Sequence, residues 1–174
     1  MKKIALILFG SSLVLLTWMA TAQNQPASKS LKSKASNSAA TSEHKMMLPD
    51  ELQWSAAPPG LPPGAQTAVL DGDPAKPGSF TVRLKSPADY KVMPHTHPTP
   101  ERITVLSGAF HLGMGEKFEE KTGRELGPGS FVVLPAGMAH FAWTKDETII
   151  QINSEGPFQI NYVNPADDPR GPKK

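Results

Sequence analysis

Short apolar or alternating runs, each about as long as a β-strand, recur from residue 66 to residue 163. They span 66–70, 79–85, 89–93, 102–106, 109–114, 130–134, 139–144, 147–152 and 157–163. Ile, Val, Phe, Thr and Tyr dominate these runs, and segments such as Phe80 to Leu84 alternate with period two, which is typical of half-buried strands. Apart from a short helical turn expected around Glu116 to Lys121, no long window has a helical stripe. The sequence therefore predicts an all-β sandwich or barrel.

The first 22 residues have the pattern of a secretory signal peptide. Lys2 and Lys3 give a positive start, residues 4–19 are uncharged and mostly apolar, and Ala20-Thr21-Ala22 supplies the small residues of a cleavage site. The apolar stretch is shorter than the roughly 20 residues of a membrane-spanning helix, so export is favoured over an uncleaved anchor. We expect cleavage between Ala22 and Gln23, and a periplasmic or secreted protein without stable membrane insertion.

The composition of the mature chain excludes several classes of partner. Without Lys2 and Lys3, 16 of the 18 basic residues remain against 16 acidic ones, so the formal net charge falls from +2 to zero. No basic block interleaved with aromatic residues occurs, so nothing in the sequence indicates nucleic acid or an anionic membrane surface as a partner. The chain has no cysteine, which excludes disulfides, thiolate metal sites, a cysteine nucleophile and a lipid-modified cysteine.

Four segments follow from these patterns: a signal peptide over 1–22, a flexible linker over 23–45, a folded domain over 46–165 and a polar tail over 166–174. The linker is rich in Ser, Ala, Lys, Asn and Gln and has too few apolar residues to offset the entropy of ordering it. His44 belongs to the linker and is expected in solvent.

A histidine-rich stretch carries the chemistry of the domain. In His-Thr-His-Pro-Thr-Pro-Glu, the two histidines, His95 and His97, are two residues apart in a segment that its prolines keep extended, so both face one point. Glu101 begins the next apolar run and can return a carboxylate to that point. A buried run, a Pro-Ala-Gly turn and a returning run then place His140 on an adjoining strand.

These stretches resemble the paired motifs of the cupin superfamily. The first motif has His-x-His, then Glu, six residues and Gly, and the second has Gly, five residues, Pro-x-Gly, two residues and His; the match covers about 80–144. The resemblance implies a single-domain, RmlC-like jelly-roll barrel (a double-stranded β-helix) of the cupin 2 type. It places metal ligands at His95, His97, Glu101 and His140, and structural residues at Gly108, Gly129, Pro135 and Gly137. Asp89 and Thr144 depart from the Gly and Asn that the motifs often have.

A single divalent transition metal ion is the expected cofactor. Three imidazoles and a carboxylate suit Fe, Mn, Co, Ni, Cu or Zn; Fe, Mn and Zn are preferred, and the identity stays open. The alternative is a metal-free barrel with ordinary buried histidines, but each of those groups would then need another hydrogen-bond partner. The leader has no twin-arginine pair, so we expect metal uptake after export.

The resemblance implies an enzyme that acts on a small oxygen-bearing molecule, and a dioxygenase-type oxidoreductase is preferred. Glu101 would then be both a ligand and a base. The alternative is a non-catalytic module that stores metal or senses a small ligand; a third reading is a metal-stabilised structural barrel. We also expect a homodimer, because such barrels leave sheet edges and the chain has no net charge to oppose pairing.

For several other side chains, a functional role and a structural role are both possible. His111 could act as an acid or base in the cavity, although a surface or core position is favoured. Arg83 could bind a substrate carboxylate, although a solvated strand face is favoured. Four aromatic residues could line a pocket, although core positions are favoured: Tyr90, Phe131, Phe141 and Trp143.

Overall fold

The computed structural model describes residues 44–171, so the predicted signal peptide and nearly all of the predicted linker lie outside the described part. The strands are β1 (Ser55–Ala56), β2 (Gln66–Asp71), β3 (Gly78–Ser86), β4 (Lys91–Thr96), β5 (Glu101–Ser107), β6 (Phe110–Met114), β7 (Arg124–Leu126), β8 (Phe131–Leu134), β9 (His140–Thr144), β10 (Thr148–Gly156) and β11 (Asn161–Tyr162). Three short 3-10 helices are η1 (Pro49–Glu51), η2 (Glu120–Thr122) and η3 (Pro165–Asp167). No helix among these residues is long and apolar enough to cross a membrane.

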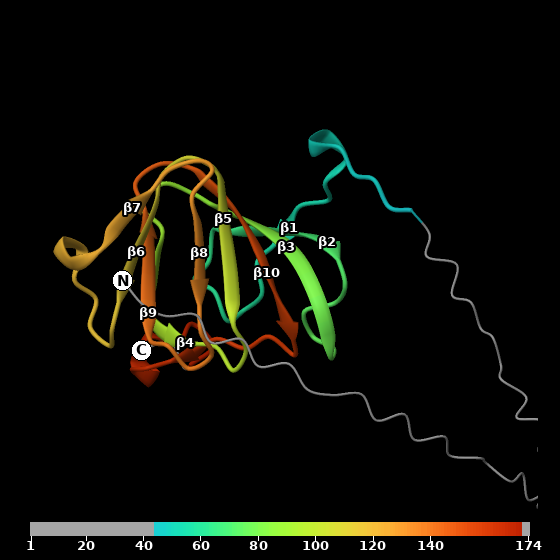
Figure 1. Cartoon of the computed structure of the whole chain (residues 1–174). Coiled ribbons are helices and arrows are strands. Elements are labelled where there is room, and N and C mark those ends of the chain that lie inside the picture. Colours follow the sequence, from blue (N-terminus) through green and yellow to red (C-terminus); the bar gives the residue numbers. More distant parts are fainter. Residues whose placement is uncertain (1–43, 172–174) are drawn as a thin grey trace, which may run out of the picture. The chain divides into compact units, whose positions relative to one another are not determined.

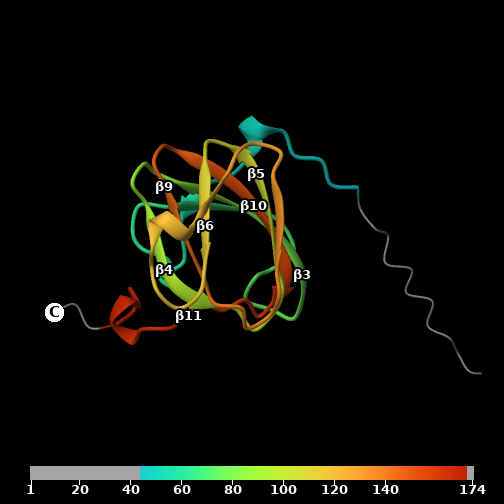
Figure 2. The same ribbon diagram turned by 60° about the vertical axis from the view of Figure 1, so that its left-hand side comes forward.

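The strands form two antiparallel sheets that face each other (Figures 1 and 2). One sheet has the order β1-β2-β3-β10-β5-β8 and the other has the order β11-β4-β9-β6-β7. Chain neighbours such as β4 and β5 lie in different sheets, as in a jelly roll. The predicted all-β jelly-roll barrel is confirmed.

Alternation along the strands fills the space between the sheets. On β3, Phe80, Val82 and Leu84 are buried, and on β10 Ile150 and Ile152 are buried. These side chains belong to one apolar core, which also includes residues of β4, β5 and β6. The core surrounds the cavity that contains the histidines.

Most predicted runs coincide with strands, and the differences have local causes. β4 begins at Lys91, not residue 89, because Asp89 has a positive φ of 56° that ends the extended backbone. Thr144, the other departure from the motifs, holds this turn: its hydroxyl donates to Pro87 O at 2.7 Å. The 157–163 run is mostly an irregular segment, in which only Asn161–Tyr162 forms a strand, β11, paired with β4.

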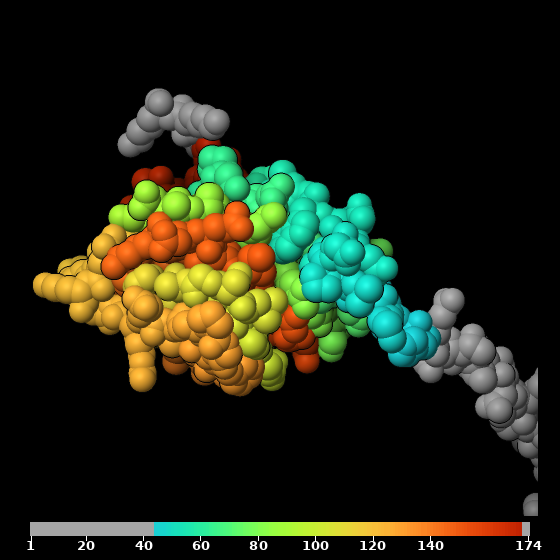
Figure 3. Space-filling view, turned by 90° about the horizontal axis from the view of Figure 1, so that it is seen from above, coloured from blue at the N-terminus to red at the C-terminus, as the bar shows by residue number. Residues whose placement is uncertain are grey.

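The outer face of β9 is covered by the segment that carries η2, which projects from one end of the domain (Figures 1 and 3). Phe118 of this segment lies 5.0 Å from Phe141 and 5.8 Å from Trp143 between ring centroids. The helical turn expected around Glu116 to Lys121 is found only as η2, at Glu120–Thr122, and the irregular residues before it carry Phe118, which closes an aromatic cluster. Phe131 was expected to be a core residue, and this expectation was wrong: on the edge strand β8 it is 61% exposed.

Candidate metal centre

Strand pairing brings the three predicted histidines together. His95 on β4 is the register partner of His140 on β9, and His97 follows β4 directly. All three side chains are buried, and one ligand nitrogen from each lies within 4.8 Å of the others. The two histidine motifs thus meet inside the barrel, as their alternation predicted.

The turn before β9 is tied to the first motif. Gly137 donates its backbone N–H to His97 O at 2.9 Å, and its φ of +74° lies in the left-handed region that favours glycine. Gly108 and Gly129 also have positive φ. The glycines of the motifs therefore shape the turns that hold the ligand-bearing strands.

A backbone carbonyl orients each imidazole ring. Nδ1 lies 2.7 Å from Met93 O in His95, 2.7 Å from Gln159 O in His97 and 2.9 Å from Met138 O in His140. A carbonyl only accepts, so Nδ1 carries the proton and donates it in every case. This tautomer leaves the Nε2 lone pairs free, which is the arrangement typical of metal-ligating histidines.

Glu101 places a carboxylate beside two of the three nitrogens, those of His97 and His140. It is the first residue of β5 and is 5% exposed. Its Oε2 lies 3.4 Å from Nε2 of His97 and 3.5 Å from Nε2 of His140. Two ligands bound to one ion at about 2.0–2.2 Å are roughly 2.9–3.5 Å apart, so these separations fit a shared metal position.

One nitrogen atom of the cluster has no hydrogen bond. Nε2 of His97 is buried and has no hydrogen-bond partner. Leaving such an atom unsatisfied costs about 1–3 kcal/mol, which metal coordination would remove. The histidine group could therefore hold a metal ion, and the donor set suits a first-row transition metal.

The electrostatics favour the protonation states that metal binding requires. Burial, together with the neighbouring imidazoles of His140 and His97, lowers the pKa of His95 to about 3, so its ring stays neutral at ordinary pH. Burial raises the pKa of Glu101, whereas positive charge at the position that the imidazoles of His140 and His97 face, such as that of a bound metal ion, lowers it and keeps the carboxylate ionised. A neutral imidazole and an ionised carboxylate are the ligand forms.

A small apolar cavity of about 70 Å³ surrounds the cluster. Its only ionisable groups are the three histidines and Glu101; every other lining residue is apolar: Leu61, Leu84, Val92, Ile103, Phe110, Ala142, Ile150, Ile152, Phe158 and Ile160. Pockets for larger ligands measure about 300–1,000 Å³, so this one accepts only a few atoms beside the ligands.

The remaining candidates lie elsewhere. His111 is on the outer face, where it stacks on Trp143 at 4.9 Å and its Nε2 contacts Glu125 at 3.1 Å. Arg83 alternates with the buried Val82 and Leu84, so it faces away from the cavity. The favoured readings, a strand or core position for His111 and a strand face for Arg83, agree with these positions.

None of the ten apolar residues of the cavity wall was identified as a pocket residue from the sequence, and three of them lie outside the strands: Leu61, Phe158 and Ile160. Phe158 stacks on His97 with ring centroids 4.4 Å apart. The alternation of Phe158 and Ile160 was a usable signal, because residues two apart in an extended segment share a face. Leu61 stands in a Pro- and Gly-rich loop, and nothing in that composition indicates which surface it covers.

This fold and this site define a cupin: a jelly roll with His, His, Glu and His inside the barrel. The family model of the ChrR cupin-like domain matches residues 42–159, and the chain belongs to that family. No curated protein matches the sequence.

Several solved structures share the fold at low identity. The polyketide cyclase RemF from Streptomyces resistomycificus is 18% identical with a TM-score of 0.60, over 73% of this chain and 90% of that one. A candidate acetylacetone dioxygenase from Methylibium petroleiphilum is 18% identical with a TM-score of 0.56, over 74% and 87%. KdgF from a Halomonas species is 23% identical with a TM-score of 0.50, over 65% and 94%. At these identities the likeness concerns the fold alone.

Proposed function

We propose that the protein is a metal-dependent enzyme that acts on a small oxygen-bearing molecule, with dioxygenase-type oxidoreductase chemistry. The observation that carries the proposal is the unpartnered, buried Nε2 of His97, which faces a carboxylate inside an apolar cavity. His95, His97, Glu101 and His140 would hold one divalent ion, with Fe, Mn or Zn preferred. When bound, the ion would polarise a substrate oxygen and, as Fe or Mn, would also supply redox chemistry.

The protein's own residues have distinct tasks in this proposal. The Nδ1 hydrogen bonds hold the imidazoles in position, and the apolar wall keeps water away from the reacting atoms. Glu101 would balance the charge of the ion, and it is the one carboxylate among the residues that line the cavity, so it is the candidate base. The candidate acetylacetone dioxygenase among the similar folds supports a compact diketone as the substrate.

The alternative is a binding module that stores metal or senses a small ligand without turnover. The small cavity favours it as much as it favours an enzyme, because few atoms fit beside the ligands. Turnover distinguishes the two functions.

The test uses protein purified from its own compartment, with metal content measured first. Oxygen consumption is then followed with small 1,3-diketones and 2-hydroxy ketones. The enzyme reading predicts oxygen uptake that matches substrate loss. It also predicts that Glu101→Gln, which keeps the size and one oxygen, retains part of the metal and loses turnover. A ligand-induced spectral change without oxygen uptake or product would support the binding module instead.

The predicted location and assembly are part of the proposal. We expect the mature protein to begin at Gln23 outside the inner membrane, and native mass spectrometry of the cell fractions tests this; a membrane fraction that retains residues 1–22 would contradict it. We also expect a homodimer. The exposed apolar side chains of Phe131 and Val133 on the edge strand β8 support this expectation. A monomeric mass by light scattering at micromolar concentration would contradict it.

A further inference from the structure

The metal cavity approaches solvent at one side of the described domain. All of its lining residues are buried except Leu61, Phe158 and Ile160, which are partly exposed. Phe158 stacks on the His97 ring and is therefore tied to a ligand. These three side chains therefore form the part of the cavity wall nearest to solvent, and Leu61 is the one contributed by a separate loop.

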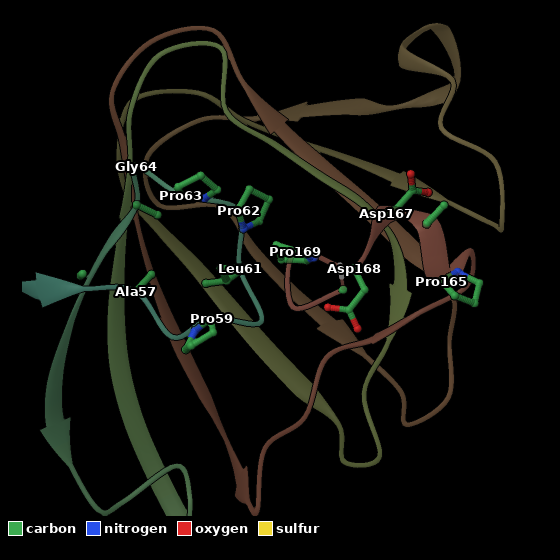
Figure 4. Close-up of a pocket in the computed structure, with 14 residues that line it drawn as sticks. Ala57, Pro59, Leu61, Pro62, Pro63, Gly64, Pro165, Asp167, Asp168 and Pro169 are labelled. Atoms are coloured by element: carbon green, nitrogen blue, oxygen red, sulfur yellow. The ribbon is translucent and has the colours of Figure 1, made fainter. Parts of the chain in front are cut away.

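A second, larger hollow of about 880 Å³ lies against the same loop (Figure 4). Its walls are the loop over 56–65, which contributes small apolar residues and three prolines, and the segment over 165–171, which contributes Pro165 and Pro169 beside Asp167 and Asp168. Leu61 is the one residue that lines both this groove and the metal cavity. Its side chain therefore stands between the two spaces.

Two tyrosines fix the backbone on either side of Leu61. The hydroxyl of Tyr162 donates to Gly60 O at 2.9 Å, and the hydroxyl of Tyr90 donates to Pro62 O at 2.7 Å. Burial raises the pKa of Tyr162 to about 12, so this hydroxyl stays protonated and remains a donor. The loop is thus held at both neighbours of Leu61, which defines where its side chain stands.

We propose that the groove is the route by which substrate reaches the metal cavity, and that Leu61 selects substrates by size. This inference rests on the proposed function. Because the cavity admits only a few atoms, the oxygen-bearing head of the substrate enters it and the apolar body stays among the prolines of the groove. The substrate class is a small molecule with two oxygens in a 1,3 arrangement, as in a diketone, and an apolar substituent.

The test measures ligand association with the Co(II)-loaded mature chain by stopped-flow visible spectroscopy, without turnover. The probes are azide, acetylacetone and the larger benzoylacetone. Leu61→Ala should accelerate benzoylacetone binding about tenfold and leave azide nearly unchanged, and Leu61→Trp should slow both diketones by a similar factor. Val69→Ala, which truncates an exposed aliphatic side chain on β2, should bind all three probes as the unaltered protein does.

The outcomes separate this inference from the proposed function. Equal rates for all Leu61 variants in Co(II)-loaded protein would overturn the route and leave the metal site intact. No Co(II) binding by the unaltered chain would overturn both. Circular dichroism checks that the variants are folded, and Leu61→Met, which nearly conserves volume, replaces Leu61→Ala if that variant unfolds. In that case a benzoylacetone rate that differs from that of the unaltered chain supports the route, and an equal rate overturns it.

Discussion

A histidine is buried on each side of the paired strands β6 and β9, and the two histidines have different surroundings. His140 on β9 faces the cavity, and His111 on β6 faces the outer side. On the inner face, His140 lies among two other imidazoles and a carboxylate, with Nδ1 bound to the backbone and Nε2 turned to the centre. On the outer face, His111 stacks on Trp143, and its Nε2 faces Glu125, which is 64% exposed at its side chain. Burial of a histidine therefore does not indicate a metal site; convergence of free nitrogens does.

The residues that pack on the outer face explain why the surroundings of His111 differ from those of His140. Phe118 packs on Phe141 and Trp143, and Lys91 pairs with Glu120 at 2.8 Å beside them. Among the described residues, the mostly exposed Glu125 is the one metal-ligating type of side chain that contacts His111, and these two form no cluster of three ligands. The outer face is thus an aromatic packing layer, and the inner face is a ligand cluster.

The largest expected effect is on metal affinity, and it distinguishes the cavity histidines from His111. His97→Ala or His140→Ala should weaken metal affinity by about a hundredfold or more, because each removes a ligand and opens a gap in the site. His111→Gln is the matched control, since it changes a buried histidine on the outer face, and it should keep full metal occupancy. Elemental analysis of the purified variants measures this. Equal metal loss in His111→Gln would remove the distinction between the faces.

The second prediction disrupts the outer face alone. A methyl group at Gly113 would overlap the ring of Phe141, so Gly113→Ala should cost roughly 2–3 kcal/mol of unfolding free energy. Urea denaturation measures this cost. The metal affinity of the folded variant should stay unchanged, because Gly113 does not line the cavity. Gly127→Ala, where a methyl group would meet nothing, is the control.

The third prediction concerns acid and the metal-free protein. His95 has a folded pKa of about 3 against the ordinary value of 6.5, so its neutral ring contributes stability that is fully present above pH 6.5 and is lost as the pH falls towards 3. Between pH 7 and pH 5 the loss should be about 2 kcal/mol, before Glu101 begins to titrate. Urea denaturation at several pH values measures it, and His95→Gln should flatten the dependence. An equally steep dependence in His95→Gln would assign the effect to another group.

The smallest effect is expected for the outer ion pair. Glu125→Gln should change stability by less than about 1 kcal/mol, because Glu125 is mostly exposed and its charge is screened by solvent. Metal content should not change. A change of several kcal/mol in urea denaturation would show that His111 depends on this carboxylate far more than its exposure indicates.

Much of the fold and the ligand cluster could be predicted because both rest on local periodicity. Alternation with period two located most strands, and the spacing of His95 and His97 placed both rings on one face. The cover of the outer face could not be predicted, because residues 116–121 are mainly charged and only Phe118 marks contact with the sheet. The role of Leu61 was hidden for a related reason: a run of Pro and Gly predicts a turn and says nothing of the cavity it closes.

The most direct test of the central claim is X-ray absorption at the metal edge of protein purified from its own compartment. We expect one ion per chain with nitrogen and oxygen ligands at about 2.0–2.2 Å and scattering from three imidazoles. One imidazole should disappear in His97→Ala, and none should disappear in His111→Gln. Protein without stoichiometric metal, or a metal without imidazole scattering, would contradict it.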